Sequence, residues 1–251
     1  MTRHIAVVHE AESDFVTATD LADRVLQESV GWLRDVDIRD CRVWFSESRE
    51  GRRLTWTGIK KMAKAAKVRG HGHFRRRGGD PGNPGEDDAR AARRAILYLL
   101  EEFPDLDAII LIRDRDKYPD RRAGLEQARA EDHGGIPIVI GLAVVEREAW
   151  VLCGFHPVDE AEVAMITAAR QRLGFDPCLR SHELTAYGED AAKRSAKRAL
   201  HELTAGDLDR ERRCWLHPAL PTLRGRGAEN GLADYLGDVR DRLVGLFGRP
   251  A

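Results

Sequence analysis

The sequence lacks several features that would assign it to a class at once. It contains no apolar run of roughly 18 residues, the length that a membrane-spanning helix needs, and its opening residues, MTRHIAVVHE, lack the apolar core of a signal peptide. Its four cysteines, at positions 41, 153, 178 and 214, are too widely spaced for a zinc site or a disulfide framework. We therefore expect a cytoplasmic protein with no membrane partner, in which Cys41 and Cys153 are buried thiols.

Net charge is also nearly absent, but this neutrality conceals a segregation. The chain has 41 basic and 42 acidic residues, for a net charge of −1. Residues 51–79 contain ten Lys or Arg and no Asp or Glu, which leaves 31 basic and 42 acidic residues elsewhere. A strong local field on a protein of opposite sign concerns its partners rather than its fold. The ATP-binding pattern GxxxxGK[ST] is missing, so we do not expect the chain itself to hydrolyse ATP.

Apolar runs that alternate with helical patterns predict an α/β fold with a mostly parallel sheet and helices on both faces. The expected strands are 3–9, 41–46, 107–116 and 136–145. The expected helices among them are 13–32, with Ser13 as N-cap, 57–68 and 86–102. From about residue 155 only helical patterns remain, at 158–173, 189–204 and 229–247. We predict a catalytic domain over 1–154, with a basic insert at 51–85, and an α-helical C-terminal subdomain over 155–251.

Three pairs of acidic residues follow three of the expected strands: Glu10 with Glu12, Asp114 with Asp116, and Glu146 with Glu148. Ligands of such sheets bind beyond the carboxyl ends of the strands. Residues two apart in an extended chain point the same way, so each of the last two pairs can converge on one point. Clustered carboxylates favour a hard divalent cation, Mg²⁺ or Mn²⁺, and such an ion suits phosphoryl transfer.

These residues resemble the Toprim domain of topoisomerases, primases and OLD-type nucleases. VVHEAESD matches the family's glutamate motif, with Glu10 as the glutamate, Asp14 as the trailing acid and Ala11 where glycine is usual. LIRDRD matches its DxD motif. VVEREAWVLCGF, whose Trp150 we expect in the core, looks like a segment of stand-alone bacterial Toprim-like proteins linked to phage defence. GLADYLGDV is similar to the tail of those proteins.

The resemblance implies a Toprim-like, Rossmann-like fold and a metal-dependent nuclease that cleaves phosphodiester bonds in DNA or RNA. Glu10 would act as general acid–base or metal ligand, while Asp114 and Asp116 would bind Mg²⁺. Glu146 and Glu148 would complete a second metal position. The expected role is that of an effector in bacterial anti-phage defence, and the helical part would cap the sheet, form a homodimer face or dock a partner such as an ATPase.

The basic segment supplies candidate contacts for a nucleic acid. Lysines recur there at helical spacing, an arginine cluster and two histidines follow, and two aromatic residues could stack on bases. The candidates are Lys60, Lys61, Lys64, Lys67, His71, His73, Arg75, Arg76, Arg77 and, outside the segment, Lys117, with Trp56 and Phe74 as the aromatic residues. A solvated helix beside a loop would show the same pattern.

Two other functions fit the same residues. The acidic site could serve a phosphoryl or nucleotidyl transferase, or a phosphatase, that acts on small molecules. Alternatively, the chain could be a non-catalytic nucleic-acid-binding subunit of a defence complex, whose acids hold a structural ion or none.

Overall fold

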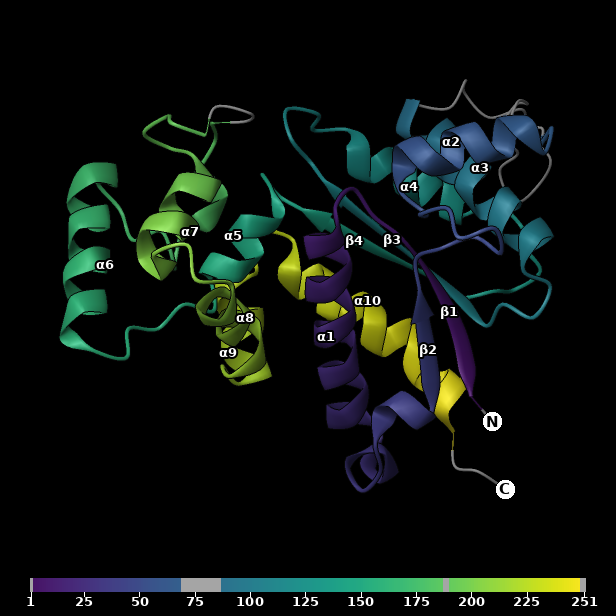
Figure 1. Cartoon of the computed structure of the whole chain (residues 1–251), viewed down its shortest axis with the longest axis horizontal. Helices are drawn as coiled ribbons and strands as arrows, with labels where there is room; N and C mark the ends of the chain where they lie inside the picture. The colour runs from purple at the N-terminus through teal and green to yellow at the C-terminus, as the bar shows by residue number, and fades with distance from the viewer. Residues whose placement is uncertain (1, 69–86, 187–189, 249–251) are drawn as a thin grey trace.

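A parallel four-stranded sheet forms the centre of the protein (Figure 1). The structure is a computed structural model that describes residues 2–68, 87–186 and 190–248. The strands are β1 (Arg3–Val8), β2 (Arg42–Phe45), β3 (Ala108–Asp114) and β4 (Ile138–Ala143). They lie in the order β2-β1-β3-β4, with Val8 of β1 opposite Leu111 of β3, and Asp114 opposite Ala143 of β4.

Helices cover both faces of the sheet. One face packs against α1 (Glu12–Ser29) and α10 (Leu232–Leu243), and the other against α2 (Trp56–Ala65), α3 (Asp87–Glu102) and α4 (Arg121–Arg129). Alternate residues of each strand enter opposite layers: Ile5 joins the first core, whereas Ala6 joins the second. Burial on both faces explains why these strands are continuous apolar runs rather than alternating ones.

The rest of the C-terminal part is helical and lies to one side of the sheet, at the left of Figure 1. It consists of α5 (Arg147–Leu152), α6 (Glu160–Leu173), α7 (Ala196–Thr204), α8 (Leu208–Leu216) and α9 (Leu220–Arg226). Its buried side chains, among them Leu200 and Leu223, continue the same core that contains Ile5 of the sheet. In the described part of the chain, no helix combines the length and apolarity that crossing a membrane requires.

The packing around Trp150 joins three helices. The indole is 2% exposed, donates a hydrogen bond from Nε1 to the Asn230 carbonyl (2.8 Å) and stacks on Tyr235 at 5.2 Å between ring centroids. The Tyr235 hydroxyl donates to the carbonyl of Ala18 in α1 (2.8 Å). The expectation that Trp150 is a core residue is confirmed, and the contacts tie α5 and α10 to α1.

The α/β class, the parallel sheet and the helical C-terminal part are confirmed. Ser13 is not the N-cap of α1: Ala11 takes that position, because the Asp14 carboxylate accepts hydrogen bonds from the backbone N–H groups of Glu10 (3.2 Å) and Ala11 (2.7 Å). Of the two thiols expected to be buried, Cys153 is, whereas Cys41 is only half-buried. The sequence does not predict the short helices α4, α5, α8 and α9, because elements of six to nine residues are too short to show a helical period.

Candidate functional site

Glu10 and Asp114 lie at the switch point of the sheet, where the chain stops adding strands on one side of β1 and adds the next on the other. From β1 the chain continues to β2 on one side, while β3 pairs with β1 on the other. Such a switch point leaves a crevice at the carboxyl ends of the two central strands, where ligands of doubly wound sheets bind. Glu10 stands two residues beyond β1, Asp114 is the last residue of β3, and Asp116 follows it after one residue.

Asp114 is the centre of the acidic group. Its Oδ1 accepts a hydrogen bond from the backbone N–H of Arg147 (2.9 Å). Burial, followed in decreasing order by the charges of Asp14, Glu10, Glu148 and Asp116, raises the pKa of Asp114 to about 9. These five side chains therefore share one electrostatic field, and Asp114 holds a proton at neutral pH when no cation is bound.

Two arginines from the β3 end and α4 offset part of this negative charge. Arg113 Nε lies 3.3 Å from Glu10 Oε1, and Arg121 Nη1 lies 2.9 Å from Asp116 Oδ2. Asp88 of α3 bridges both arginines, at 2.5 Å from Arg113 and 3.2 Å from Arg121. Partial burial raises the pKa of Glu10, with Arg113 acting in the opposite direction and Asp116 in the same one.

Arg147 provides the buried cation on the other side of the acidic group. Its side chain is 8% exposed and contacts Glu211 of α8 (2.8 Å), Glu148 (3.5 Å) and Asp14 (3.8 Å). It also donates to the Thr17 hydroxyl (3.2 Å). Burial raises the pKa of Asp14, against the opposing effects of its hydrogen bond from Ala11 and of Arg147. Arg147 thus positions α1, α5 and α8 around the carboxylates.

The backbone is strained at two points beside these residues. Asp116 has a φ of 50° and Val145 a φ of 79°, and the Asp116 N–H donates to the Val145 carbonyl (3.1 Å). A positive φ is rare for a β-branched residue such as valine. Strain of this kind gathers at functional sites, where the surrounding structure holds the chain in place.

The third acidic pair does not have the extended geometry that the sequence suggested. Glu146 is the residue before α5 and Glu148 lies in its first turn, and residues two apart on a helix point in different directions. Glu148 adds to the field at Asp114, whereas Glu146 is buried, with 5% of its surface exposed. Burial alone would lower the pKa of Lys197 on α7, but the charges of Glu146, Glu148, Asp190 and Asp114 together raise it. The helical part therefore adds a cation near these acids.

The candidate nucleic-acid contacts fall into two groups. Lys60, Lys61 and Lys64 are exposed on α2, and Lys67 and Lys117 are exposed just beyond α2 and Asp116. The remaining basic candidates, His71, His73, Arg75, Arg76 and Arg77, lie outside the described residues, as does Phe74.

Trp56, expected to stack on bases, is instead engaged within the fold. Its Nε1 donates to the Ile112 carbonyl (2.7 Å), and the Arg113 guanidinium lies 4.8 Å from the centre of its ring. These contacts place the start of α2 beside the end of β3. The helix that carries the three lysines therefore begins at the edge of the sheet where the acidic group lies.

Within the described residues, no three His, Cys, Asp or Glu side chains already form a metal-binding arrangement. Glu10 and Asp116 lie against arginines instead. The donors themselves fit a hard cation, because all are carboxylate oxygens, and burial together with their mutual repulsion keeps a proton on Asp114. A divalent ion would replace that proton and compete with the two arginines.

Four residues of this region escaped the sequence-based reasoning: Asp88, Arg147, Lys197 and His9. Asp88 is distant in the chain from Arg113 and Arg121, Arg147 from Asp14 and Glu211, and Lys197 from Glu146 and Glu148, so no local pattern marks these contacts. His9 is fully buried, with Nδ1 at 2.8 Å from the Ala11 carbonyl and Nε2 without a hydrogen-bond partner. Burial lowers its pKa, so it stays neutral beside the site.

Comparisons with known proteins assign no family. No protein-family model matches the chain, and neither a curated protein nor a solved structure matches it. The resemblance to Toprim domains therefore stays a prediction, and the functional conclusion depends on the geometry of the site.

We expect Asp114→Asn to stabilise the metal-free protein in a pH-dependent way. The folded pKa of about 9 exceeds the value of about 3.9 for an unfolded chain. Between these values the unfolded chain loses a proton that the folded protein keeps, so wild-type stability falls as pH rises. Asparagine carries no titratable proton, so the variant does not lose folding stability in this way as the pH rises. Its side-chain oxygen can still accept the hydrogen bond from the Arg147 backbone N–H. At pH 8 with a chelator, urea unfolding should show a gain of at least about 1.4 kcal/mol, one tenfold step in equilibrium.

The gain should shrink steadily as the pH falls towards about 3, below the unfolded pKa of about 3.9, where Asp114 is protonated in both states. Asp120→Asn is the matched control, because Asp120 is exposed and its side chain caps no helix. If the free energies of unfolding of Asp114→Asn and the wild type differed by the same amount at every pH, the raised pKa of Asp114 would be contradicted. A variant less stable than the wild type at pH 8 would contradict it as well.

Proposed function

We propose that this protein is a Mg²⁺- or Mn²⁺-dependent nuclease that hydrolyses phosphodiester bonds of DNA or RNA. The supporting observation is the shared field of five carboxylates, Asp114 and its four neighbours, at the switch point of a parallel sheet. The arginines beside this group offset only part of its charge, and a divalent ion would supply the rest. A bound divalent ion would in turn attract the phosphates of a substrate.

Glu10, Asp114 and Asp116 are the residues that would hold the ion, and Glu148 with Glu146 would serve a second position. When bound, the ion would neutralise charge on the phosphate and lower the pKa of a water molecule. Glu10 is the candidate general acid–base, because its raised pKa makes proton exchange easier near neutral pH. Its side chain is 36% exposed, so a substrate can reach it.

The cations around the acidic group suit the negatively charged backbone of the substrate. Lys117 is exposed directly after Asp116, and α2 presents Lys60, Lys61 and Lys64 from its start at the same edge of the sheet. Lysines arranged in this way bind phosphates without reading bases. We infer that the enzyme recognises nucleic acid by charge and shape.

A place in bacterial anti-phage defence, a cytoplasmic location, an ATPase partner and a homodimer are further parts of this proposal. The defence role and the ATPase partner rest on the resemblance of the Glu10 and Asp114 motifs to those of Toprim proteins. Co-purification from the native host and sedimentation of the pure chain address the partner and the homodimer separately.

We expect the double variant Asp114→Ala/Asp116→Ala to abolish divalent-dependent cleavage. The two substitutions remove carboxylates that would hold the ion, and the burial cost at Asp114 is relieved, so the variant should stay folded. The measurement is cleavage of plasmid, single-stranded DNA and tRNA with Mg²⁺ or Mn²⁺, scored on gels, with circular dichroism to verify folding. Loss of at least about a hundredfold in rate is expected when a catalytic ion is lost.

Glu12→Gln and Asp120→Ala are the matched controls, because both acids are exposed and lie next to the motifs without entering the field at Asp114. Cleavage that persists in the double variant would disprove the assignment of the site. Absence of nucleic-acid cleavage together with turnover of nucleotides or a phosphomonoester by the wild type would replace the nuclease with a small-molecule phosphatase.

We expect Lys60→Gln/Lys61→Gln/Lys64→Gln to weaken nucleic-acid binding and its salt dependence. Each phosphate contact contributes about 0.7 to 0.9 to the slope of log K against log salt concentration, so the slope should fall by about 2 to 3 if all three lysines bind phosphates. Fluorescence anisotropy of a labelled DNA strand, without divalent ions, measures this slope. The charge-matched control replaces three exposed arginines elsewhere, Arg39, Arg180 and Arg240, with Gln. An equal change in both triple variants would show a general charge effect instead of a contact surface.

A further inference from the structure

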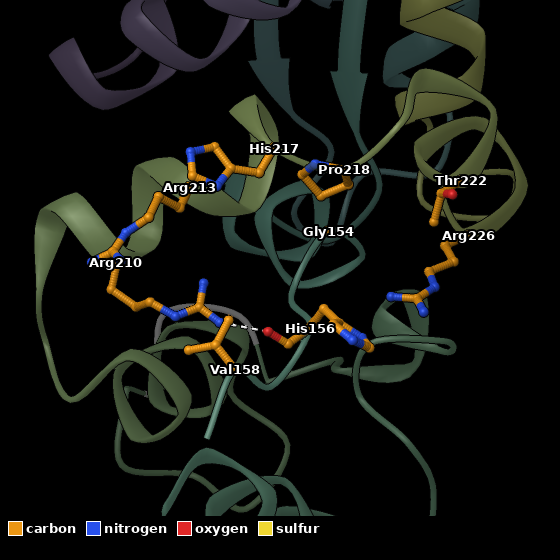
Figure 2. Close-up of a pocket in the computed structure, with 9 residues that line it drawn as sticks. All are labelled: Gly154, His156, Val158, Arg210, Arg213, His217, Pro218, Thr222 and Arg226. Atoms are coloured by element: carbon orange, nitrogen blue, oxygen red, sulfur yellow. Dashed lines mark hydrogen bonds between the residues drawn. The ribbon is translucent and has the colours of Figure 1, made fainter. Parts of the chain in front are cut away.

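The helical part of the chain contains a pocket of about 480 Å³ that is separate from the acidic group (Figure 2). Its walls come from the segment after α5, which includes Gly154, His156 and Val158, and from α8 and α9 with their connection. Pockets of roughly 300 to 1,000 Å³ are the size of small-molecule sites. None of the residues assigned to the acidic site lines it.

The lining of this pocket is cationic. Arg210, Arg213, Arg226, His156 and His217 belong to it, whereas none of the nine residues that line it is Asp or Glu. The remaining walls, including Val158 and Pro218, are largely apolar. A cavity with this composition favours a ligand that joins an anionic group to an organic part.

Arg210 is a fixed part of the wall rather than a free charge. Glu162 of α6 accepts from its Nε (2.5 Å) and Nη2 (2.8 Å), and the His156 carbonyl also accepts from Nη2 (2.8 Å). The guanidinium lies 4.5 Å from the centre of the Phe155 ring. Since Glu162 neutralises it, Arg210 holds the His156 segment in place and shapes the pocket.

Arg213 and Arg226 carry the charge that remains. Arg213 donates from Nε to the Asp209 carbonyl of its own helix (3.3 Å) and otherwise adds only to the field at Glu162, which Arg210 already binds. Arg226 donates from Nη1 to the carbonyls of Cys153 (3.3 Å) and Phe155 (3.1 Å). Among the described residues neither arginine forms an ion pair with a carboxylate. Carbonyl groups orient a guanidinium but leave its charge uncompensated.

The two arginines lie on opposite sides of the pocket. Figure 2 shows Arg226 extending from α9 towards the His156 segment, whereas the Arg213 side chain runs back along α8. Guanidinium groups bind phosphate oxygens through paired hydrogen bonds. The volume exceeds what a phosphate ion alone would fill, so the apolar walls and the two imidazoles are available to an organic part.

We infer that this pocket binds a phosphate-bearing small molecule of mononucleotide size, with Arg226 on the phosphate. The site is distinct from the carboxylates around Asp114 and does not depend on the proposed nuclease activity. Inorganic phosphate would occupy the charged part only, and an uncharged nucleoside would occupy the apolar part only.

Isothermal titration calorimetry with the full chain, in a chelator and low-salt buffer, tests this inference. The probes are the four common nucleoside monophosphates, ribose 5-phosphate, inorganic phosphate and adenosine. At least one organic phosphate should bind saturably, and more tightly than inorganic phosphate or adenosine. Arg226→Gln should weaken that binding by about tenfold or more, the equivalent of one charge-assisted hydrogen bond. Thermal unfolding verifies the folding of this variant, because Arg226 also donates to two carbonyls.

Arg212→Gln is the matched control, since this neighbouring arginine of α8 lies against Asp20 and outside the pocket. It should change the dissociation constant by less than about twofold, as expected for an exposed ion pair. The Asp114→Ala/Asp116→Ala variant should bind the ligand as the wild type does. No saturable binding by any organic phosphate in the panel, unchanged binding in Arg226→Gln, or loss of binding in the Asp114/Asp116 variant would each overturn the inference.

Discussion

Mutual repulsion among carboxylates at the carboxyl ends of β1 and β3 is the constraint around which this protein is organised. Burial and four neighbouring acids raise the pKa of Asp114 to about 9. The fold limits this cost with arginines on two sides: Arg113 and Arg121, joined by Asp88, on one side, and the buried Arg147 on the other. The strained φ angles at Asp116 and Val145 occur at the same edge. Such an arrangement costs stability and is therefore better explained by a function than by the needs of the fold.

Helix α8 connects the acidic group with the pocket of the helical part. Its Glu211 binds Arg147 (2.8 Å), which in turn contacts Asp14 and Glu148. The adjacent Arg210 and, one turn on, Arg213 line the pocket. The helical part is therefore more than a cover for the sheet, because it supplies both a counter-charge for the carboxylates and the walls of a cationic cavity. The net charge of only −1 is instead the sum of the basic residues 51–79 and the acidic excess of the remaining chain.

The sequence predicted those features that depend on local patterns and on the geometry of parallel sheets. Continuous apolar runs marked the strands, and the parallel arrangement brought Glu10 and Asp114 to one edge although they are distant in the chain. Contacts that depend on tertiary packing could not be read in this way. Nothing near Arg147 indicates that it meets Glu211, and the pocket is formed by short, highly charged helices without an apolar pattern. The extended spacing assumed for Glu146 and Glu148 failed because a six-residue helix begins between them.

The carboxylates around Asp114 should bind a divalent cation. Calorimetric titration of the protein with Mn²⁺ at pH 7.5 measures this binding. Repeating the titration in buffers with different ionisation enthalpies gives the number of protons released. Because Asp114 holds a proton in the metal-free protein, binding should release about one proton per ion, and Asp114→Asn should bind far more weakly and release none. Absence of binding, or equal binding by wild type and Asp114→Asn without proton release, would contradict the account.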